Sequence, residues 1–231
     1  MKNTHELEDD LRERWLKSYP DDERKAFCFD GLCYNGEIYN DGKNAHQGNE
    51  EKLWNNTDRR ILFLMKDTNN NSDSDYREWH WRNINHNFFN CIFKWLEGLS
   101  RISKDFIPTM ENGDYAAVPN AVVTKYPLAI VNIKKISGTS FVSNKTLYEY
   151  ANRDKAFLQE QIRGILHPNI IVCGGGKGTV LNIAKNIIYE DESFREINYF
   201  CHYSRKLNIL LIDSFHPSAR INSYWKIEDM M

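Results

Sequence analysis

The residues of this chain that could do chemistry stand at the ends of apolar runs of the sequence. Asp67 supplies a carboxylate, Asn132 a carboxamide and His216 an imidazole, and Gly175 and Lys177 belong to the glycine-rich stretch CGGGKG. A carboxylate can orient or deprotonate a water molecule, an amide can read the polar edge of a ligand, and an imidazole can donate a hydrogen bond to a developing anion. Together they would make a hydrolytic site if the fold brings them to one place.

Four apolar runs predict the strands that position these residues. Continuous rather than alternating hydrophobicity is typical of strands covered on both faces, as in a parallel sheet. Ligands of open parallel sheets bind beyond the carboxyl ends of the strands, so we expect the polar residues to converge there. The runs are ILFLMK at 61–66, LAIVNI at 128–133, IIVCGGG at 170–176 and LNILLID at 207–213.

Segments with helical spacing separate the predicted strands. The clearest is 147–166, where Thr146 and Glu149 predict a capping box and Pro168 ends the helix. Others cover about 84–100, about 178–189 and, near the start of the chain, about 5–18. Helices between parallel strands indicate right-handed crossovers and therefore an α/β fold.

We predict a three-layer α/β/α sandwich around a mostly parallel four-stranded sheet. The chain of 231 residues is long enough for one such domain, with a core at about 60–225 and an irregular N-terminal region at 1–58. The net charge of −2 excludes a polycation that coats nucleic acid or membrane. No stretch reaches the roughly 20 apolar residues of a membrane span, and the chain begins without a signal-peptide pattern. We expect a cytoplasmic monomer with reduced cysteines.

The glycine-rich stretch lacks two known phosphate-binding motifs. A P-loop needs glycine where Ile171 stands, and GxGxxG counted from Gly174 needs glycine where Thr179 stands. The backbone amides of such a turn can still bind a single phosphate, and a plain strand-to-helix turn is the alternative. The five cysteines include no CxxC pair, and Cys28 and Cys33 do not have a known iron–sulfur spacing.

In their order and spacing, three motifs resemble the uracil-DNA glycosylase superfamily. MKDTNN places Asp67 where that family has the acidic residue of its GQDPYH-type motif, AIVN places Asn132 at the base-reading asparagine, and FHPSAR places His216 in the HPS motif. The resemblance covers roughly residues 60–225. Thr68 and Asn69 replace the proline and tyrosine of GQDPYH, so the aromatic residue that excludes a 5-substituent in uracil enzymes is absent.

The resemblance implies a monofunctional DNA glycosylase that flips a base out of the DNA and leaves an abasic site. Asp67 would stabilise the cationic sugar and orient the attacking water, and His216 would stabilise the departing base. Asn132 would bind the base. The DNA backbone and vacated stack would be bound by Ser218, Arg220, Lys177 and Gly175. An aromatic lid from Tyr76, Trp79 or Trp81 is expected, and no metal or other cofactor is needed.

The run of asparagines at 69–71 bears on the substrate. A pocket lined by Asn69 and Asn70 in place of the excluding aromatic should accept a pyrimidine with a polar group at C5, such as hydroxymethylated or glucosylated cytosine in phage DNA. The resemblance to the superfamily, which includes enzymes that act on such bases in phage defence, implies a role in defence, and a role in DNA repair stays open. Two alternatives stay open: an inactive member that binds DNA or protein, and a metal-dependent phosphate-handling hydrolase that uses the glycine turn and Asp67.

Several of these residues also have purely structural interpretations. Asp67 and Asn132 could simply end their strands, and His216 could be a buried histidine with satisfied hydrogen bonds. Asp30 is a candidate for a further acidic residue at the rim, and a turn residue before Gly31 is the preferred interpretation. Lys134 and Lys135 are expected to form a solvated strand exit. The aromatic residues after Asp67 are expected to serve mostly in packing, and they are Trp79, Trp81, Phe88, Phe89 and Trp95.

Overall fold

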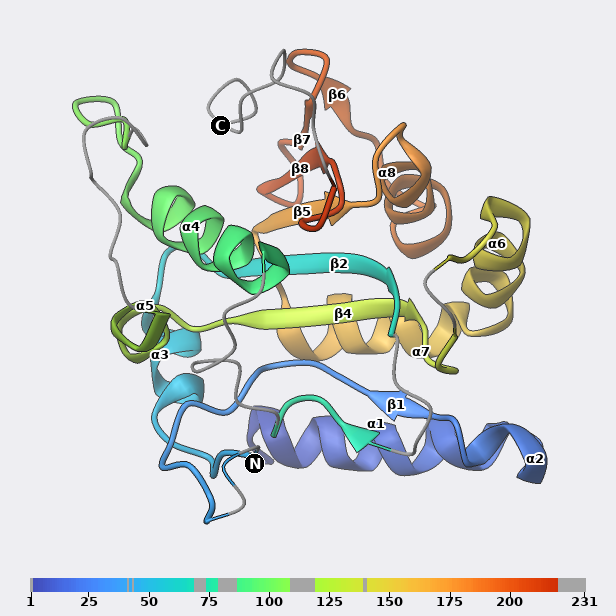
Figure 1. The fold of residues 1–231 in the computed structure, drawn as a ribbon. Coiled ribbons are helices and arrows are strands. Elements are labelled where there is room, and N and C mark those ends of the chain that lie inside the picture. Colours follow the sequence, from blue (N-terminus) through green and yellow to red (C-terminus); the bar gives the residue numbers. More distant parts are fainter. Residues whose placement is uncertain are drawn as a thin grey trace.

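The four apolar runs form adjacent parallel strands in the computed structural model, which describes residues 2–40, 42, 44–68, 74–78, 87–108, 119–138 and 141–219. The strands are β2 (Ile61–Asp67), β4 (Ala129–Lys134), β5 (Ile170–Gly174) and β8 (Ile209–Ser214). They lie in the order β4-β2-β5-β8 (Figure 1). The predicted α/β class and its parallel strands are therefore confirmed.

The sheet contains two further strands and is mixed. β7 (Cys201–Ser204) pairs antiparallel with β8, and β6 (Arg195–Glu196) pairs antiparallel with β7, which gives six strands instead of the four expected. Both residues of β6 are exposed, and those of β7 alternate between partly and fully buried. Strands at such an edge need no continuous apolar run, so the sequence pattern did not reveal them.

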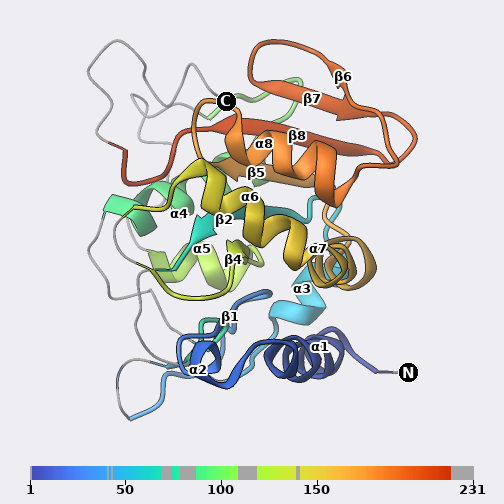
Figure 2. The ribbon, with the colours of Figure 1, turned by 90° about the vertical axis from the view of Figure 1, so that its right-hand side faces the viewer.

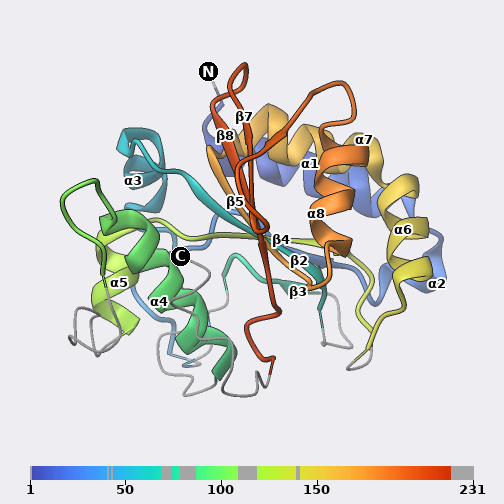
Figure 3. The same cartoon turned by 90° about the horizontal axis from the view of Figure 1, so that it is seen from above.

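Helices cover both faces of the sheet, as the view from above shows (Figure 3). α4 (Asn87–Arg101) and α5 (Pro119–Lys125) lie on one side. The other side carries α1 (Thr4–Ser18), α6 (Asn144–Arg153), α7 (Lys155–Gln159) and α8 (Thr179–Ile183). Alternate residues of each strand enter the two cores: in β2, Leu64 packs in the core on the α1 side and Phe63 in the core on the α4 side.

The region 1–58 is built into the sheet edge next to β4. Residues 27–33 run antiparallel to β4, through bridges between Phe27 and Ile136 and between Leu32 and Ala129. Within this segment, β1 (Cys28–Phe29) pairs with β3 (Ser74–Asp75). α1 packs below it, at the edge opposite to β6 and β7 (Figure 2). The remaining helices of this region are α2 (Asp21–Arg24) and α3 (Glu50–Asn56).

The predicted helix 147–166 begins earlier than expected and is divided. Its N-cap is Ser143, whose side chain accepts a hydrogen bond from the backbone N–H of Thr146, so the expected capping box at Thr146 was wrong. α6 ends at Arg153, with Asp154 as its C-cap, and α7 and the π-helical segment η1 (Glu160–Leu166) continue to the predicted end. A similar π-helical segment, η2 (Ala184–Ile188), follows α8. None of the helices in the described ranges has the length and apolar character of a membrane span.

Candidate functional site

The strand order creates a switch point at β2. The chain leaves β2 to form β4 on one side and then returns to form β5 on the other, and ligands of such sheets bind in the crevice beyond the carboxyl ends at this point. Asp67 is the last residue of β2, Asn132 lies near the end of β4, Gly175 follows β5, and His216 lies two residues after β8. The structure therefore places these predicted residues along one edge of the sheet.

Close contacts connect β4, β2, β5 and the loop after β8 near the carboxyl ends of these strands. Met65 of β2 lies opposite Asn132 of β4 in the strand register. The sulfur of Met65 lies against Gly174, where an added Cβ would be 2.4 Å from Met65 Sδ and 3.6 Å from Pro217 Cδ. Glycine at this position permits the close approach of β2 and the FHPSAR loop. These contacts connect β4, which carries Asn132, to Pro217, the residue that follows His216.

Asp67 is paired with Lys134, its neighbour in the β2–β4 register. Lys134 Nζ lies 3.7 Å from Asp67 Oδ2, and both side chains are about nine-tenths buried, at 8% and 10% exposed. Asp67 Oδ2 has no hydrogen-bond partner among the described residues. Burial raises the pKa of Asp67 above its ordinary value, although the charge of Lys134 opposes the shift. A raised pKa suits a carboxylate that accepts a proton from water.

Asn132 is buried and held by Asp30. Asp30 Oδ2 accepts hydrogen bonds from the backbone N–H of Asn132 at 3.0 Å and from its side-chain Nδ2 at 2.9 Å. Lys135 donates to the other carboxylate oxygen of Asp30. The expectation that Lys134 and Lys135 are solvated was wrong, because they are 7% and 0% exposed. The expectation for Asp30 was also wrong, since it is fully buried at the sheet edge instead of lying in an open turn.

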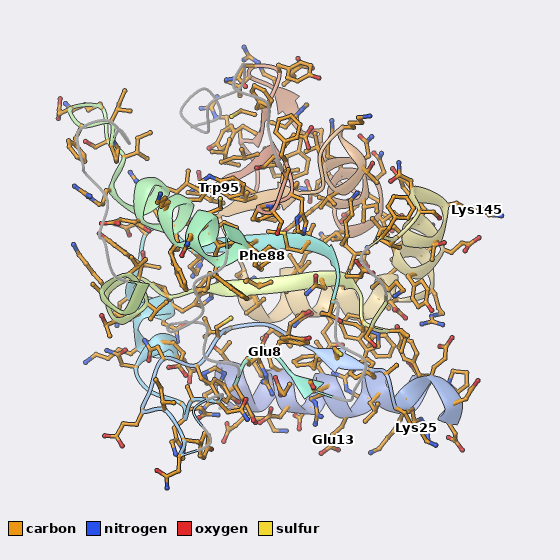
Figure 4. The ribbon with its side chains drawn as sticks, in the orientation of Figure 1. Glu8, Glu13, Lys25, Phe88, Trp95 and Lys145 are labelled. Atoms are coloured by element: carbon orange, nitrogen blue, oxygen red, sulfur yellow. The ribbon has the colours of Figure 1, made fainter. Side chains whose placement is uncertain are left out.

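His216 is held as a neutral imidazole. Its Nδ1 accepts a hydrogen bond from the backbone N–H of Ser218 at 3.2 Å, which leaves the ring proton on Nε2. Its ring lies 5.4 Å from the ring of Phe88 on α4, measured between centroids; Figure 4 shows Phe88 at the start of α4, beside the sheet. Burial lowers the pKa of His216, and the charge of Lys66 lowers it further. Lys66 also lowers the pKa of Asp67, so one cation influences both residues.

The glycine turn after β5 uses its backbone amides within the protein. Gly175 and Gly176 donate to the carbonyl oxygen of Ser214, at 3.1 and 2.8 Å. Gly178, with φ of 72°, donates to Asp213 Oδ2 at 3.1 Å. A protein carboxylate thus already occupies part of the predicted anion site. The side chain of Lys177 is exposed and remains available to a phosphate.

Several predicted residues lie outside the described part of the chain. These are Asn69, Asn70, Arg220, Trp79 and Trp81. Tyr76 is described: its backbone N–H donates to the carbonyl oxygen of Phe29, beside the N-terminal segment. Ser218 is exposed next to His216. Phe89 and Trp95 belong to the core between α4 and the sheet, as expected for packing residues.

Sequence reasoning named Asp30, Lys134 and Lys135 but did not predict that they are buried, and it did not single out Asp213. The signal for Lys134 was its place two residues after Asn132, on the same face of a strand and at the level of Asp67. The role of Asp30 depends on pairing between segments about 100 residues apart, which no local pattern reveals. For Asp213 the signal was weak, since a carboxylate at a strand end is common.

Comparison with known proteins adds no assignment. No protein-family model matches the chain, and no curated protein matches it either. Within the described ranges, no group of three or more His, Cys, Asp or Glu side chains could hold a metal ion. The functional assignment therefore depends on the residues at the carboxyl edge of the sheet.

Proposed function

We propose that this protein is a monofunctional DNA glycosylase that hydrolyses the N-glycosidic bond of a modified pyrimidine and leaves an abasic site. The observation that carries the proposal is the position of Asp67, Asn132 and His216 at the carboxyl ends of β2, β4 and β8, around the switch point of the sheet. The sequence resemblance to the uracil-DNA glycosylase superfamily rests on these same residues. The helices on both faces agree with the three-layer architecture that the family implies.

Hydrolysis of this bond develops positive charge on the sugar and negative charge on the base. Asp67 suits the first charge, because its carboxylate has a buried oxygen without a hydrogen-bond partner in the described structure. That oxygen can accept a proton from the attacking water, and the carboxylate charge stabilises the cationic sugar. Lys134 favours the ionised form of Asp67, which both tasks require.

His216 suits the second charge as a neutral donor. With Nδ1 accepting from Ser218 N–H, Nε2 carries the proton and can donate to an oxygen of the departing base. A neutral imidazole stabilises the anion through this hydrogen bond without protonating it. The lowered pKa of His216 keeps the ring in this form at neutral pH. Removal of one such donor typically costs about 3 kcal/mol of transition-state stabilisation.

Asn132 supplies the amide that reads the base, and Ser218, Arg220 and Lys177 supply contacts to the DNA backbone. The substrate that we propose is a pyrimidine with a polar C5 substituent, such as hydroxymethylated or glucosylated cytosine in phage DNA. Support for this choice comes from the sequence, where Thr68 and Asn69 replace the aromatic motif that excludes such substituents. The protein would act in the cytoplasm as a monomer.

The test is incubation of the protein with phage and genomic DNAs that carry different base modifications, followed by alkaline cleavage at abasic sites. We expect strand breaks in at least one modified DNA. Asp67→Asn should reduce their rate by at least about 100-fold. The matched control is Asp105→Asn, which changes an exposed aspartate after α4 and should cleave like the wild type.

The two alternatives give different results in this assay. Binding to DNA without any abasic product, and with no effect of Asp67→Asn, would indicate an inactive member of the fold. Loss of activity on addition of a chelator would indicate the metal-dependent hydrolase, since the proposed chemistry uses only protein side chains and water. Either result would contradict the proposal.

A further inference from the structure

Asp30 and Asn132 form a contact that bears on base selection. Asp30 Oδ2 accepts from both the main chain and the side chain of Asn132, and Asp30 Oδ1 accepts from Lys135. All three groups around the carboxylate are donors. Burial raises the pKa of Asp30, while the charge of Lys135 and the hydrogen bonds from Lys135 and Asn132 lower it. Because both carboxylate oxygens accept from these donors, the nitrogen of the Asn132 amide faces Asp30 and its oxygen faces away.

The orientation of Asp30 is itself fixed by buried groups. Lys135 donates to Gln161 Oε1 at 3.3 Å, and Gln161 Nε2 donates to the backbone oxygen of Asp30 at 2.6 Å, which closes a ring of hydrogen bonds. The ammonium of Lys135 also lies 4.8 Å from the centre of the Trp15 ring on α1. Asp30, Lys135 and Gln161 are each at most 1% exposed. Turning the Asn132 amide over would place its oxygen against this carboxylate, at the cost of a repulsive contact in a buried site.

We infer that Asp30 is a specificity-determining residue, which holds the Asn132 amide in one of its two orientations and so selects one type of Watson–Crick edge. A cytosine presents an amino donor beside a ring acceptor, whereas a uracil presents a carbonyl acceptor beside a ring donor. With its nitrogen held by Asp30, the Asn132 amide has one fixed arrangement of donor and acceptor. For a base bound in a given position, this arrangement is complementary to the cytosine edge or to the uracil edge, but not to both. Asp30 acts through Asn132 and needs no contact with the substrate. The inference rests on the proposed function.

The decisive variant is Asp30→Asn. An asparagine at position 30 can accept from Asn132 Nδ2 or donate to Asn132 Oδ1, so both orientations of the Asn132 amide become available. Two oligonucleotides of the same sequence carry the same C5 group, one on cytosine and one on uracil, and their abasic-site rates are compared. The C5 group is chosen from the modified phage and genomic DNAs in which the protein produces abasic sites. We expect the wild type to distinguish the two bases roughly 10- to 100-fold.

Asp30→Asn should bring this ratio to within a few-fold of one, by slowing the preferred substrate and accelerating the other. A residue that only stabilises the fold would slow both substrates equally and leave the ratio unchanged, and that result would overturn the inference. The control is Glu97→Gln. Glu97 on α4 is also a buried carboxylate, and its Oε1 accepts a hydrogen bond from Arg101 Nη1 at 3.2 Å, outside the ring of hydrogen bonds around Asp30. Its substitution should leave the ratio unchanged.

A second measurement separates this inference from the proposed function. The side-chain amide protons of Asn132 are assigned by NMR from their loss in Asn132→Asp, and their exchange with solvent is followed without any substrate. We expect slow exchange in the wild type and in Glu97→Gln, and exchange at least tenfold faster in Asp30→Asn. Equal exchange in wild type and Asp30→Asn would overturn the role of Asp30. Absence of abasic product from every DNA would overturn the proposed function alone.

Discussion

Asp67 experiences two opposing influences on its pKa. Burial raises the pKa, because water no longer solvates the carboxylate, and the ammonium of Lys134 lowers it by favouring the charged form. Lys134 has a lowered pKa for the same reason of burial, and Asp67 opposes that shift. The buried pair therefore sets the pH at which Asp67 ionises and could serve as the proposed base.

Replacement of Lys134 by methionine should change the pH dependence of the proposed reaction. Without the ammonium, only burial and the weaker effect of Lys66 act on Asp67, so its pKa rises further. A base must be ionised to act, and a higher pKa therefore moves the acidic limb of the profile of kcat/KM to higher pH. The measurement is the rate of abasic-site formation from pH 4 to 9, at roughly half-unit steps.

The matched control for this variant is Lys145→Met, which removes an exposed lysine of α6 (Figure 4). Its acidic limb should coincide with that of the wild type. An acidic limb that stays in place in Lys134→Met, even if the maximal rate falls, would show that Asp67 is not the group that titrates.

His216 should act through its donor proton and not through a positive charge. His216→Ala removes the donor, and we expect a loss of roughly 100- to 1,000-fold in kcat. His216→Asn restores a side-chain donor and should recover part of this loss. Since the pKa of the wild-type imidazole is lowered, its activity should persist above pH 7, where an imidazolium would be lost. A wild-type rate that falls in step with deprotonation of a histidine would contradict this role.

At the scale of elements, α6 tests how a helix start is specified. Ser143 accepts a hydrogen bond from the backbone N–H of Thr146 at 3.0 Å, and the Thr146 hydroxyl lies 2.8 Å from the Ser143 hydroxyl. Ser143→Ala leaves this N–H without its cap and should lower the free energy of unfolding by about 1 kcal/mol. Thr146→Ala keeps the cap and should cost less than half as much. Urea denaturation followed by circular dichroism measures both, and equal effects would contradict the assignment of the cap.

The strands were more predictable than the helix boundaries, for a physical reason. A strand covered on both faces must be apolar throughout, so β2 and β5 stand out from the sequence as continuous runs. The start of a helix depends on which of several adjacent serines and threonines adopts an extended backbone. Ser143 and Thr146 both satisfy the composition of a cap, and only the backbone of Ser143 is extended.

The sequence predicted those features of the candidate site that follow from the topology of a parallel sheet. Strand ends converge whatever the details of packing, so the locations of Asp67 and Asn132 followed from the order of strands. Their partners were not predictable in this way. Asp30 and Lys135 meet because a segment near the start of the chain lies against β4, and such long-range pairing leaves no periodic signal in the sequence.

At the scale of the whole molecule, the N-terminal region is continuous with the candidate site. A buried polar network leads from Asn132 through Asp30 and Gln161 to Glu8 on α1. Glu8 is fully buried, and its Oε2 lies 3.6 Å from Arg77 Nη1. A network of this kind couples the placement of α1 to the geometry of the sheet edge, since each unsatisfied member would carry a desolvation cost.

Glu8 should make the stability of the whole protein depend on pH near neutrality. Burial raises its pKa from 4.5 to about 7, against the charge of Arg77. The folded state therefore holds the proton more tightly than the unfolded state. The stabilisation of the folded state by protonated Glu8 is complete below pH 4.5 and is lost as pH rises to about 7. At 1.36 kcal/mol for each pKa unit, this change amounts to roughly 3 kcal/mol.

Glu8→Gln, which cannot ionise, should remove this part of the dependence. The free energy of unfolding, measured by urea denaturation between pH 5 and 8, should fall less steeply with pH in Glu8→Gln than in the wild type. Glu13→Gln is the matched control, because Glu13 lies on the same helix with its side chain 71% exposed (Figure 4). It should follow the wild-type curve. If Glu8→Gln and the wild type lose stability in parallel over this range, Glu8 is already ionised at pH 5, and the buried network carries a full charge beneath the sheet edge.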